Sequence, residues 1–203
     1  MRKFMKFCGF CLLLLGLFWL GSILSDRKTL DTELIRFHVL ANSDSAEDQQ
    51  IKLQLRDVMT QALQKPMSQC VDAAEADKYL SDHLASIEAL ANAALTQMGV
   101  EDKAAVSFDQ EYYPTRHYDT ISLPAGIYRS LRITIGDGKG ENWWCVVFPS
   151  LCLPAATEDF QAAAVDSGFP RSLAGALDRD PDYEVRFFFL DCIGRLRNFF
   201  QTG

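Results

Sequence analysis

The sequence predicts an α+β domain that follows a membrane-directed N-terminal segment, and three patterns lead to this expectation. An uncharged apolar run occupies residues 7–24, two helical stripes fill the first half of the remaining chain, and strand-like alternation fills much of the second half. Helices followed by a run of strands are typical of the α+β class. We therefore expect an antiparallel sheet with two helices packed on one of its faces.

The composition is that of a globular protein and argues against nucleic acid as a partner. The chain has 203 residues, of which 48% are apolar and 23% are charged, so we expect one domain with a small extension. Of 20 basic and 27 acidic residues, 3 basic residues and no acidic one lie in positions 1–25, which leaves 17 against 27 and a net charge of −10. So acidic a domain cannot neutralise the phosphates on which nucleic-acid binding depends.

The N-terminal segment predicts export. Three basic residues, the last of them Lys6, precede the 18 uncharged residues 7–24. This run is longer than the usual secretory core of about 7–15 residues and shorter than a spanning helix of about 20. No Ala-x-Ala cleavage site follows. We interpret residues 1–25 as a signal peptide or a signal anchor, and residues 26–203 as a single extracytoplasmic domain.

The first strand and the first helix follow from residues 34–65. Residues 34–40 alternate as a strand, and residues 41–45 supply turn and helix-capping side chains. An apolar stripe at helical spacing continues to about Lys65, where Pro66 is expected to end the helix.

A second helix is predicted over residues 72–98. Its apolar positions recur at helical spacing, and Gly99 supplies the residue type that most often follows a helix C-terminus. His83 falls on the apolar stripe, where we expect it to be half-buried and hydrogen-bonded.

The rest of the chain is expected to be rich in strands. Apolar and polar residues alternate, and clusters of Gly, Pro and Asn separate the alternating runs. The expected order is a strand at 104–108, a loop at 112–124, a strand at 126–135, a turn at 136–142, a strand at 143–148, a weak helix or loop at 160–178, and a strand or helix at 185–200.

The glycines at 136, 138 and 140 invite comparison with a phosphate-binding loop. Such a loop runs from a strand into a helix, whose first amide groups meet the phosphate. Here the glycines lie between two predicted strands, and no Lys-Ser or Lys-Thr pair follows. A glycine-rich hairpin turn is the better interpretation.

A metal or catalytic site has weak support in the sequence. His38, His117 and Asp44 would have to converge in space, since no His-x-x-x-His or similar ligand spacing is present. No Gly-x-Ser-x-Gly or Asp-Thr-Gly motif of a known hydrolase occurs either. We therefore expect no catalytic residue, no metal, no cofactor and no small-molecule substrate. A secreted peptidoglycan hydrolase that uses these three residues is the alternative.

Cys145 and Cys152 are the favoured disulfide pair among the four cysteines of the exported part. The residues between them include Phe148-Pro149-Ser150-Leu151, which can reverse the chain. Two buried thiols are the competing interpretation, because free cysteine packs as a small apolar residue.

Two blocks of sequence carry a family resemblance. Residues 35–57 read IRFHVLANSDSAEDQQIKLQLRD, and the core of residues 113–152 reads LPAGIYRSLRITIGDGKGENWWCVVFPSLC. The chain resembles the stage II sporulation protein R family in both blocks. It departs from the family at Asp119, where Gly is usual, and at Ser150, where Pro is common.

The resemblance implies a signalling role. Family members are exported from the forespore into the space between the two septal membranes. There they activate a membrane-embedded aspartic protease that processes pro-sigma-E to sigma-E in the mother cell, and they are not understood as enzymes. The resemblance thus implies this protease as the partner, and the N-terminal segment as the contact with the membrane.

A binding role requires an exposed patch, which we expect in the loop after the first strand, in the loop around residues 112–128 and near the paired tryptophans. Trp143 and Trp144 point to opposite faces of a strand, so one is expected in the core and the other at an interface. The candidate partner-binding residues are Asn42, Asp44, Tyr118, Tyr128, Arg132, Asn142, Trp143 and Trp144.

Overall fold

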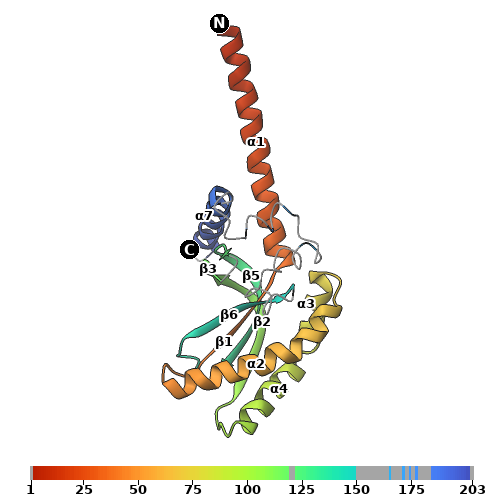
Figure 1. Cartoon of the computed structure of the whole chain (residues 1–203), viewed down its shortest axis with the longest axis vertical. Helices are drawn as coiled ribbons and strands as arrows, with labels where there is room; N and C mark the ends of the chain where they lie inside the picture. Colours follow the sequence, from red (N-terminus) through yellow and green to blue (C-terminus); the bar gives the residue numbers. More distant parts are fainter. Residues whose placement is uncertain are drawn as a thin grey trace.

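The structure is a computed structural model that describes residues 2–118, 122–149 and 184–201, together with residues 165, 171, 174 and 177. A long N-terminal helix leads into a sheet that carries helices on one side, and the C-terminal helix lies beside the base of the first (Figure 1). The helices are α1 (Arg2–Glu33), α2 (Ala46–Gln69), α3 (Ala73–Asp82), α4 (Leu84–Gln97) and α7 (Glu184–Gln201). The strands are β1 (Ile35–Leu40), β2 (Ala104–Tyr113), β3 (Arg116–His117), β4 (Ser122–Leu123), β5 (Gly126–Ile135) and β6 (Asn142–Phe148).

The fold class is α+β, as expected, but the main sheet is mixed rather than antiparallel. Its strand order is β2-β5-β1-β6, in which β1 and β5 run parallel while the other two pairs are antiparallel. The small β3–β4 pair is antiparallel as well. The parallel pair is possible because three helices and the strands β2, β3 and β4 intervene between β1 and β5, which is long enough to return the chain to the same end of the sheet.

The glycine-rich segment therefore does not form the expected hairpin. Strand β1 lies between β5 and β6, so the segment from Gly136 to Glu141 must pass over the end of β1. Such a crossing spans two strand spacings, about 9.6 Å, which a two-residue hairpin turn does not provide.

The sheet has two unlike faces because side chains alternate along each strand. On β1, Ile35, Phe37 and Val39 belong to an apolar core that α2, α3 and α4 complete. The opposite face belongs partly to a second apolar cluster, to which α1 contributes Leu30 and α7 contributes Leu190. The expected packing of helices on one face is confirmed, and the structure adds α1 and α7 on the other side.

Helix α2 continues through Pro66 and ends only at Gln69. Ser45 is its N-cap and accepts a hydrogen bond from the backbone N–H of Asp48. Met67, which is fully buried in the core, explains why the helix extends past the proline. Burial of this side chain offsets the cost of a proline so close to the helix end.

The second predicted helix is two helices that meet at His83. This residue has φ −109° and ψ 10°, outside the helical range, and it is exposed rather than half-buried. Its ring stacks on Tyr79 at 4.1 Å between centroids, and its Nδ1 lies 2.8 Å from the Tyr79 carbonyl oxygen. The break contains no Gly or Pro, so the helical spacing alone gave no sign of it. Gly99 has φ +76°, as a residue after a helix C-terminus requires.

The structure corrects the predicted end of one strand and decides the type of the last element. Strand β2 extends to Tyr113, into residues predicted as loop, because Asp109, Gln110 and Glu111 are polar and hid the alternation. Residues 185–200, for which strand and helix were both open, lie in helix α7. The segment 160–178 falls largely outside the described residues.

Helix α1 is continuous across the predicted boundary at residue 25. Its first part carries exposed apolar side chains and is long and apolar enough to cross a membrane. Ile23 and Leu30, in contrast, are fully buried against the domain. One helix thus serves as a candidate membrane segment at one end and as part of the core at the other.

Candidate functional site

The face of the sheet opposite α2–α4 concentrates polar and aromatic side chains, and we call it the polar face. It combines side chains that alternate with the core residues on all four strands, together with residues that flank β3. Its members are Arg36, His38, Glu111, Tyr113, Arg116, Tyr118, Tyr128, Ser130, Arg132, Asn142 and Trp144.

Arg36 lies at the centre of the polar face and is fully buried. Its guanidinium carbon lies 4.5 Å from the ring centroid of Tyr113 and 5.4 Å from that of Tyr128. Its Nη2 donates a hydrogen bond to the Tyr118 hydroxyl at 3.0 Å, whereas its Nε and Nη1 have no hydrogen-bond partner. Among the described residues, ring faces rather than a carboxylate surround this buried charge.

A charged network continues from Arg36 toward the edge of the sheet. His38 Nε2 lies 2.7 Å from one carboxylate oxygen of Glu111, and Arg132 pairs with the other oxygen at 2.7 Å. His38 Nδ1 lies 3.3 Å from Asn142 Oδ1. Burial by itself would raise the pKa of Glu111, but the hydrogen bond from His38 and the charge of Arg132 outweigh it, and the pKa is lowered.

Burial has the opposite result for the tyrosine beside this network. The hydroxyl of Tyr113 lies 2.6 Å from Ser130 Oγ, and burial raises its pKa even though the charge of Arg36 favours ionisation. Tyr113 and Ser130 therefore remain neutral hydrogen-bonding groups at the floor of the polar face.

The two tryptophans point to opposite faces, as strand alternation predicts. Trp144 stacks on His38 at 4.8 Å with nearly parallel rings, and the guanidinium of Arg116 lies 4.7 Å above it. Trp143 packs against Phe37 in the core and beneath the guanidinium of Arg56. Both tryptophans are half-buried, and Trp144 is the one that lies on the polar face.

Asn42 and Asp44, two of the predicted binding residues, lie in a separate structure at the end of β1. Asn42 Oδ1 accepts the backbone N–H of Asp137 at 2.9 Å, and Asp44 Oδ1 accepts that of Glu141 at 2.7 Å. The backbone N–H of Lys139 donates to the Asn42 carbonyl at 3.0 Å. We call this arrangement the clasp, because the loop after β1 holds the segment that crosses over it.

The glycines of the clasp are needed for close approach. A Cβ at position 140 would lie 2.2 Å from the Ser43 carbonyl oxygen, and one at position 136 would lie 2.3 Å from Asn42 Oδ1. Gly136 and Gly138 also have positive φ values of 54° and 62°. The Gly-x-Gly-x-Gly pattern thus serves loop packing, in keeping with its place between two strands.

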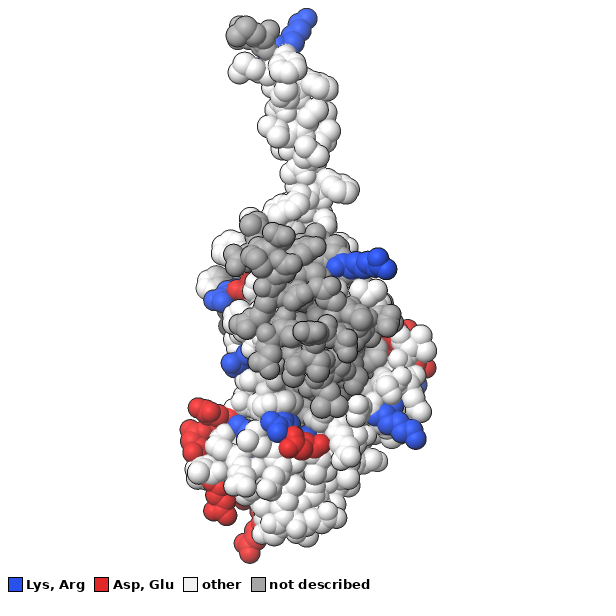
Figure 2. Space-filling view, viewed as in Figure 1, with Lys and Arg blue, Asp and Glu red and all other residues white. Residues whose placement is uncertain are grey.

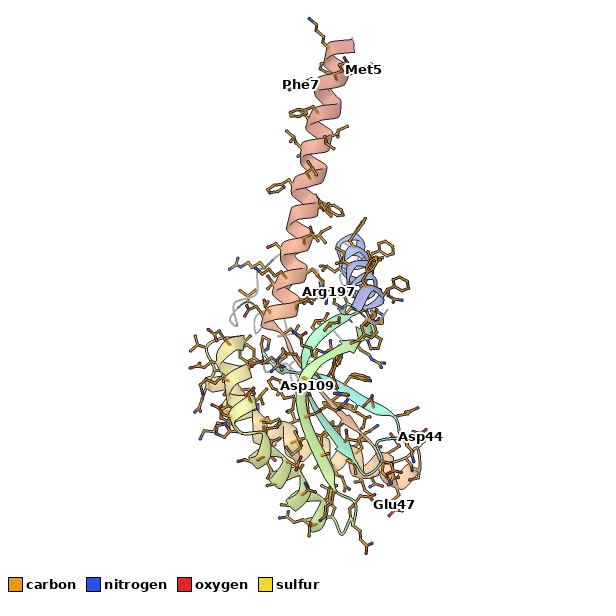
Figure 3. All side chains as sticks on the ribbon, turned by 180° about the vertical axis from the view of Figure 1, so that it is seen from behind. Met5, Phe7, Asp44, Glu47, Asp109 and Arg197 are labelled. Carbon is orange, nitrogen blue, oxygen red and sulfur yellow. The ribbon has the colours of Figure 1, made fainter. Side chains whose placement is uncertain are left out.

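The clasp lies at the end of the molecule farthest from the N-terminus. Figure 3 shows Asp44 and Glu47 at that end and Met5 and Phe7 at the other. Acidic side chains gather around the same end in the space-filling view (Figure 2). The negative charge that the composition indicated is therefore displayed away from the apolar part of α1.

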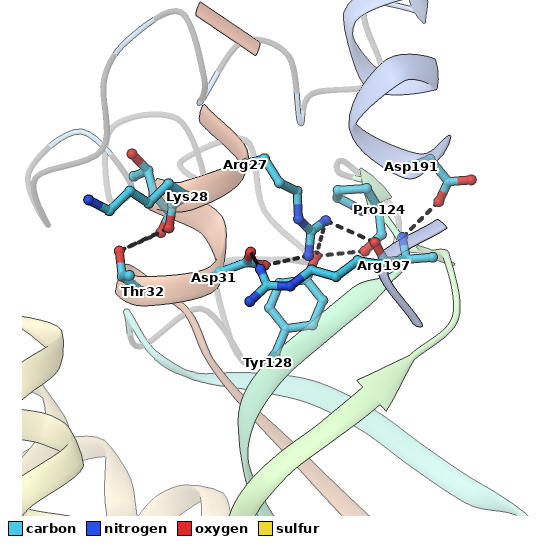
Figure 4. A network of polar contacts seen from close by, with 10 residues as sticks. Arg27, Lys28, Asp31, Thr32, Pro124, Tyr128, Asp191 and Arg197 are labelled. Atoms are coloured by element: carbon cyan, nitrogen blue, oxygen red, sulfur yellow. Dashed lines mark hydrogen bonds and ion pairs between the residues drawn. The ribbon is translucent and has the colours of Figure 1, made fainter. Parts of the chain in front are cut away.

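A junction holds α1, α7 and the start of β5 together (Figure 4). Arg27 donates to the Ala125 carbonyl at 2.8 Å and pairs with Asp31 at 2.5 Å, while Asp191 of α7 accepts the backbone N–H of Ala125 at 2.7 Å. Tyr128 is fully buried there and donates to the Pro124 carbonyl at 2.6 Å. Tyr128 thus stabilises the junction rather than forming part of the surface.

The three residues of the hydrolase alternative do not converge. His38 contacts Glu111 and Asn142, Asp44 belongs to the clasp, and the ring of His117 lies 2.7 Å from Ser122 Oγ in the small sheet. Within the described part of the chain, no group of three His, Cys, Asp or Glu side chains is placed to hold a metal ion.

Cys145 is buried in the helix-side core and is disulfide-bonded. Cys70 and Cys192 are free. Cys152 lies outside the described residues, so the pairing of Cys145 with Cys152 stays a prediction. Mass spectrometry of the non-reduced protein would identify the linked peptides.

The sequence named part of the polar face and missed its buried centre. Tyr118, Arg132, Asn142 and Trp144 were expected and do come together there. Arg36, Glu111 and Tyr113 were not expected, although their placement on one face follows from alternation once the strand order is known. The missing information was the register, which brings β1, β2 and β5 side by side.

Comparison with known proteins finds a family match over the residues that form the clasp and the polar face. The profile of the family described as stage II sporulation protein R matches residues 31–158, which is more than half of the chain. The chain belongs to the stage II sporulation protein R family. It is therefore a sporulation protein.

A curated relative supports the same family. The chain is 38% identical over 120 residues to the stage II sporulation protein R of Bacillus subtilis (strain 168), a match that covers 59% of this chain and 54% of the relative. The match thus spans about half the length of the relative. No solved structure matches the chain. Helix α7 lies beyond the residues that the family profile covers.

Proposed function

We propose that this member of the stage II sporulation protein R family is an exported signal that activates the membrane-embedded aspartic protease processing pro-sigma-E. The signal acts from the space between forespore and mother cell, by binding the protease and without chemistry of its own. Family membership carries this proposal. The apolar part of α1 supports it, because export or anchoring requires such a segment.

The polar face is the surface that we assign to the protease. Trp144, Tyr118 and Arg132 are half-buried at its rim, and Arg, Trp and Tyr are the residue types enriched at binding hot spots. Their buried neighbours fix these side chains in place: Arg36 holds the Tyr118 hydroxyl, and Glu111 pairs with Arg132. A rim that is already ordered loses less conformational entropy when a partner binds.

The test is to co-express this chain, the protease and pro-sigma-E in a host that does not sporulate, and to measure cleavage of pro-sigma-E. Cleavage should depend on the chain. The adjacent tryptophans provide a matched pair, because they have the same chemistry on opposite faces. We expect Trp144→Ala to lower cleavage beyond its effect on the thermal midpoint, whereas Trp143→Ala should lower cleavage only in proportion to lost stability.

The assignment of the polar face would be contradicted if, in both variants, the loss of cleavage bore the same ratio to the fall in thermal midpoint. Cleavage in the absence of the chain would contradict the proposed function itself. His117→Ala tests the hydrolase alternative with little risk to the fold, since this side chain is exposed. The binding proposal expects full cleavage with this variant and no effect of chelators.

A further inference from the structure

Helix α7 presents a wide apolar surface that the domain does not cover. Phe188, Phe199 and Phe200 are 61%, 72% and 73% exposed, and Leu196 is 57% exposed. At about 100° per residue, the exposed residues Phe188, Phe189, Cys192, Leu196, Phe199 and Phe200 fall within an arc of about 120° on one side of the helix. Exposed apolar patches of this kind mark a contact with a protein or a membrane.

The other side of α7 is fixed to the domain, so the orientation of the apolar arc is set. Leu190 is fully buried in the second apolar cluster, and Asp191 accepts the Ala125 backbone N–H. A Cβ at Gly194 would lie 1.7 Å from the Ala125 carbonyl oxygen, so the helix backbone itself rests on the turn before β5. The apolar arc is therefore a stable outward face rather than a loosely attached end.

The apolar part of α1 extends from beside this helix. Trp19 of α1 contacts Phe189 of α7 edge to face, with ring centroids 5.0 Å apart. If residues 7–24 cross the bilayer, Trp19 lies about 7.5 Å from the end of the membrane-spanning segment. Trp is enriched at this depth of a bilayer. Amphipathic helices that lie on a membrane insert to the same depth. Figures 1 and 3 show α7 beside the part of α1 that enters the domain.

Two arginines flank the apolar arc. Arg195 lies about 20° outside one border and Arg197 about 60° outside the other. Their side chains are 62% and 50% exposed, and they pair with Asp191 and Asp31 respectively. Basic residues beside an apolar face are typical of helices that lie in the headgroup region. The acidic clasp lies at the opposite end of the molecule, away from anionic lipids (Figure 3).

We propose that the apolar arc of α7 docks into the surface of the lipid bilayer that α1 enters, so that two helices hold the domain against the membrane. This docking does not depend on the protease. Vesicles without any other protein can therefore test it, and the outcome leaves the proposed signalling function to its own experiment.

The free, exposed Cys192 lies within the apolar arc and provides the probe position. The full chain with Cys8, Cys11 and Cys70 changed to Ser would be labelled there with an environment-sensitive fluorophore and reconstituted in phosphatidylethanolamine–phosphatidylglycerol vesicles. We expect blue-shifted emission that brominated acyl chains quench. The matched control carries Cys192→Ser and Ser81→Cys, which moves the label to an exposed site on α3, and should show water-like emission without lipid quenching.

A second variant tests whether the phenylalanines are responsible. Changing Phe188, Phe199 and Phe200 together to Ser should abolish lipid quenching at position 192 while the thermal midpoint is kept, because these side chains are exposed. Water-like emission at position 192 in the parent protein would overturn the proposal, as would unchanged quenching in the variant. Blue-shifted emission without lipid quenching, which fades as the protein is diluted, would assign the arc to a second copy of the chain instead.

Discussion

Arg36 is a buried cation whose neighbours, in the part of the chain that the structure describes, are aromatic rings rather than a carboxylate. Two of its nitrogen atoms have no hydrogen-bond partner, and an unpaired buried donor costs about 1–3 kcal/mol. Cation–π contacts with Tyr113, Tyr118 and Tyr128 each offset part of this free-energy cost. Burial of Arg36 therefore lowers the stability of the domain, which points to a role in ordering the polar face.

A substitution pair measures this cost. We expect Arg36→Met to change the free energy of unfolding by less than about 1.5 kcal/mol, because it removes a desolvated charge and keeps much of the volume. Arg36→Ala should lower it by about 3 kcal/mol, since a cavity remains. Urea unfolding followed by circular dichroism gives both values, and equal losses would show that the guanidinium itself sustains the fold.

Glu111 makes the stability of the domain depend on pH. Its pKa is lowered from 4.5 in the folded state, so the unfolded state takes up its proton first as the pH falls. The stabilisation is thus complete above about pH 4.5 and is lost as the pH falls through the lower, folded pKa.

Glu111→Gln removes this titration. The variant should be less stable than the parent at neutral pH, by about 1 kcal/mol, and the difference should shrink as the pH falls from about 5 to about 3. Urea midpoints across that range provide the measurement. A constant difference would mean that the carboxylate does not contribute through its charge.

Among the elements, the clasp shows how the space around a glycine can matter more than its backbone angle. Gly140→Ala should lower the free energy of unfolding by about 2–3 kcal/mol, because the new Cβ would overlap the Ser43 carbonyl. Gly99→Ala should lower it by only about 1 kcal/mol, since φ is +76° but nothing lies within 4 Å. Thermal unfolding of the two variants compares them directly, and the reverse order would contradict the packing argument.

The elements also show where sequence reasoning succeeds and where it fails. The alternation at Ile35 to Val39 and at Trp143 and Trp144 predicted correctly which residues share a face, because the period of a strand is fixed by its backbone. The path of α2 past Pro66 depends on the burial of Met67 in the core, and the break at His83 has no Gly or Pro to mark it. Local pattern therefore could not supply them.

The candidate site was predicted in part for the same reason. Arg36 and Tyr118 are 82 positions apart and become hydrogen-bonded neighbours only in the folded chain. Residue types such as Trp, Tyr and Arg indicated a binding surface. The strand order decided that Asn42 and Asp44 belong to the clasp and that Trp144 belongs to the polar face.

At the scale of the whole molecule, the N-terminal segment should direct the chain across the membrane. Residues 1–30 fused to a reporter that is active only outside the cytoplasm should give activity, because basic residues precede the apolar run. The control exchanges Leu13 and Leu14 for Lys, which should abolish activity by interrupting that run. A silent parent fusion that stays soluble in the cytoplasm would remove the basis for extracytoplasmic signalling.

The unbroken course of α1 couples the length of the membrane segment to the direction in which the domain faces. Each residue inserted before Ile23 would turn the domain by about 100° about the helix axis and move it by about 1.5 Å along that axis. Seven inserted residues would restore the direction to within about 20° but would displace the domain by about 10.5 Å. Few combinations of rotation and displacement let α7 reach the lipid surface while the polar face keeps its direction. The effect of insertions in this helix on signalling should therefore vary periodically with their length rather than in proportion to it.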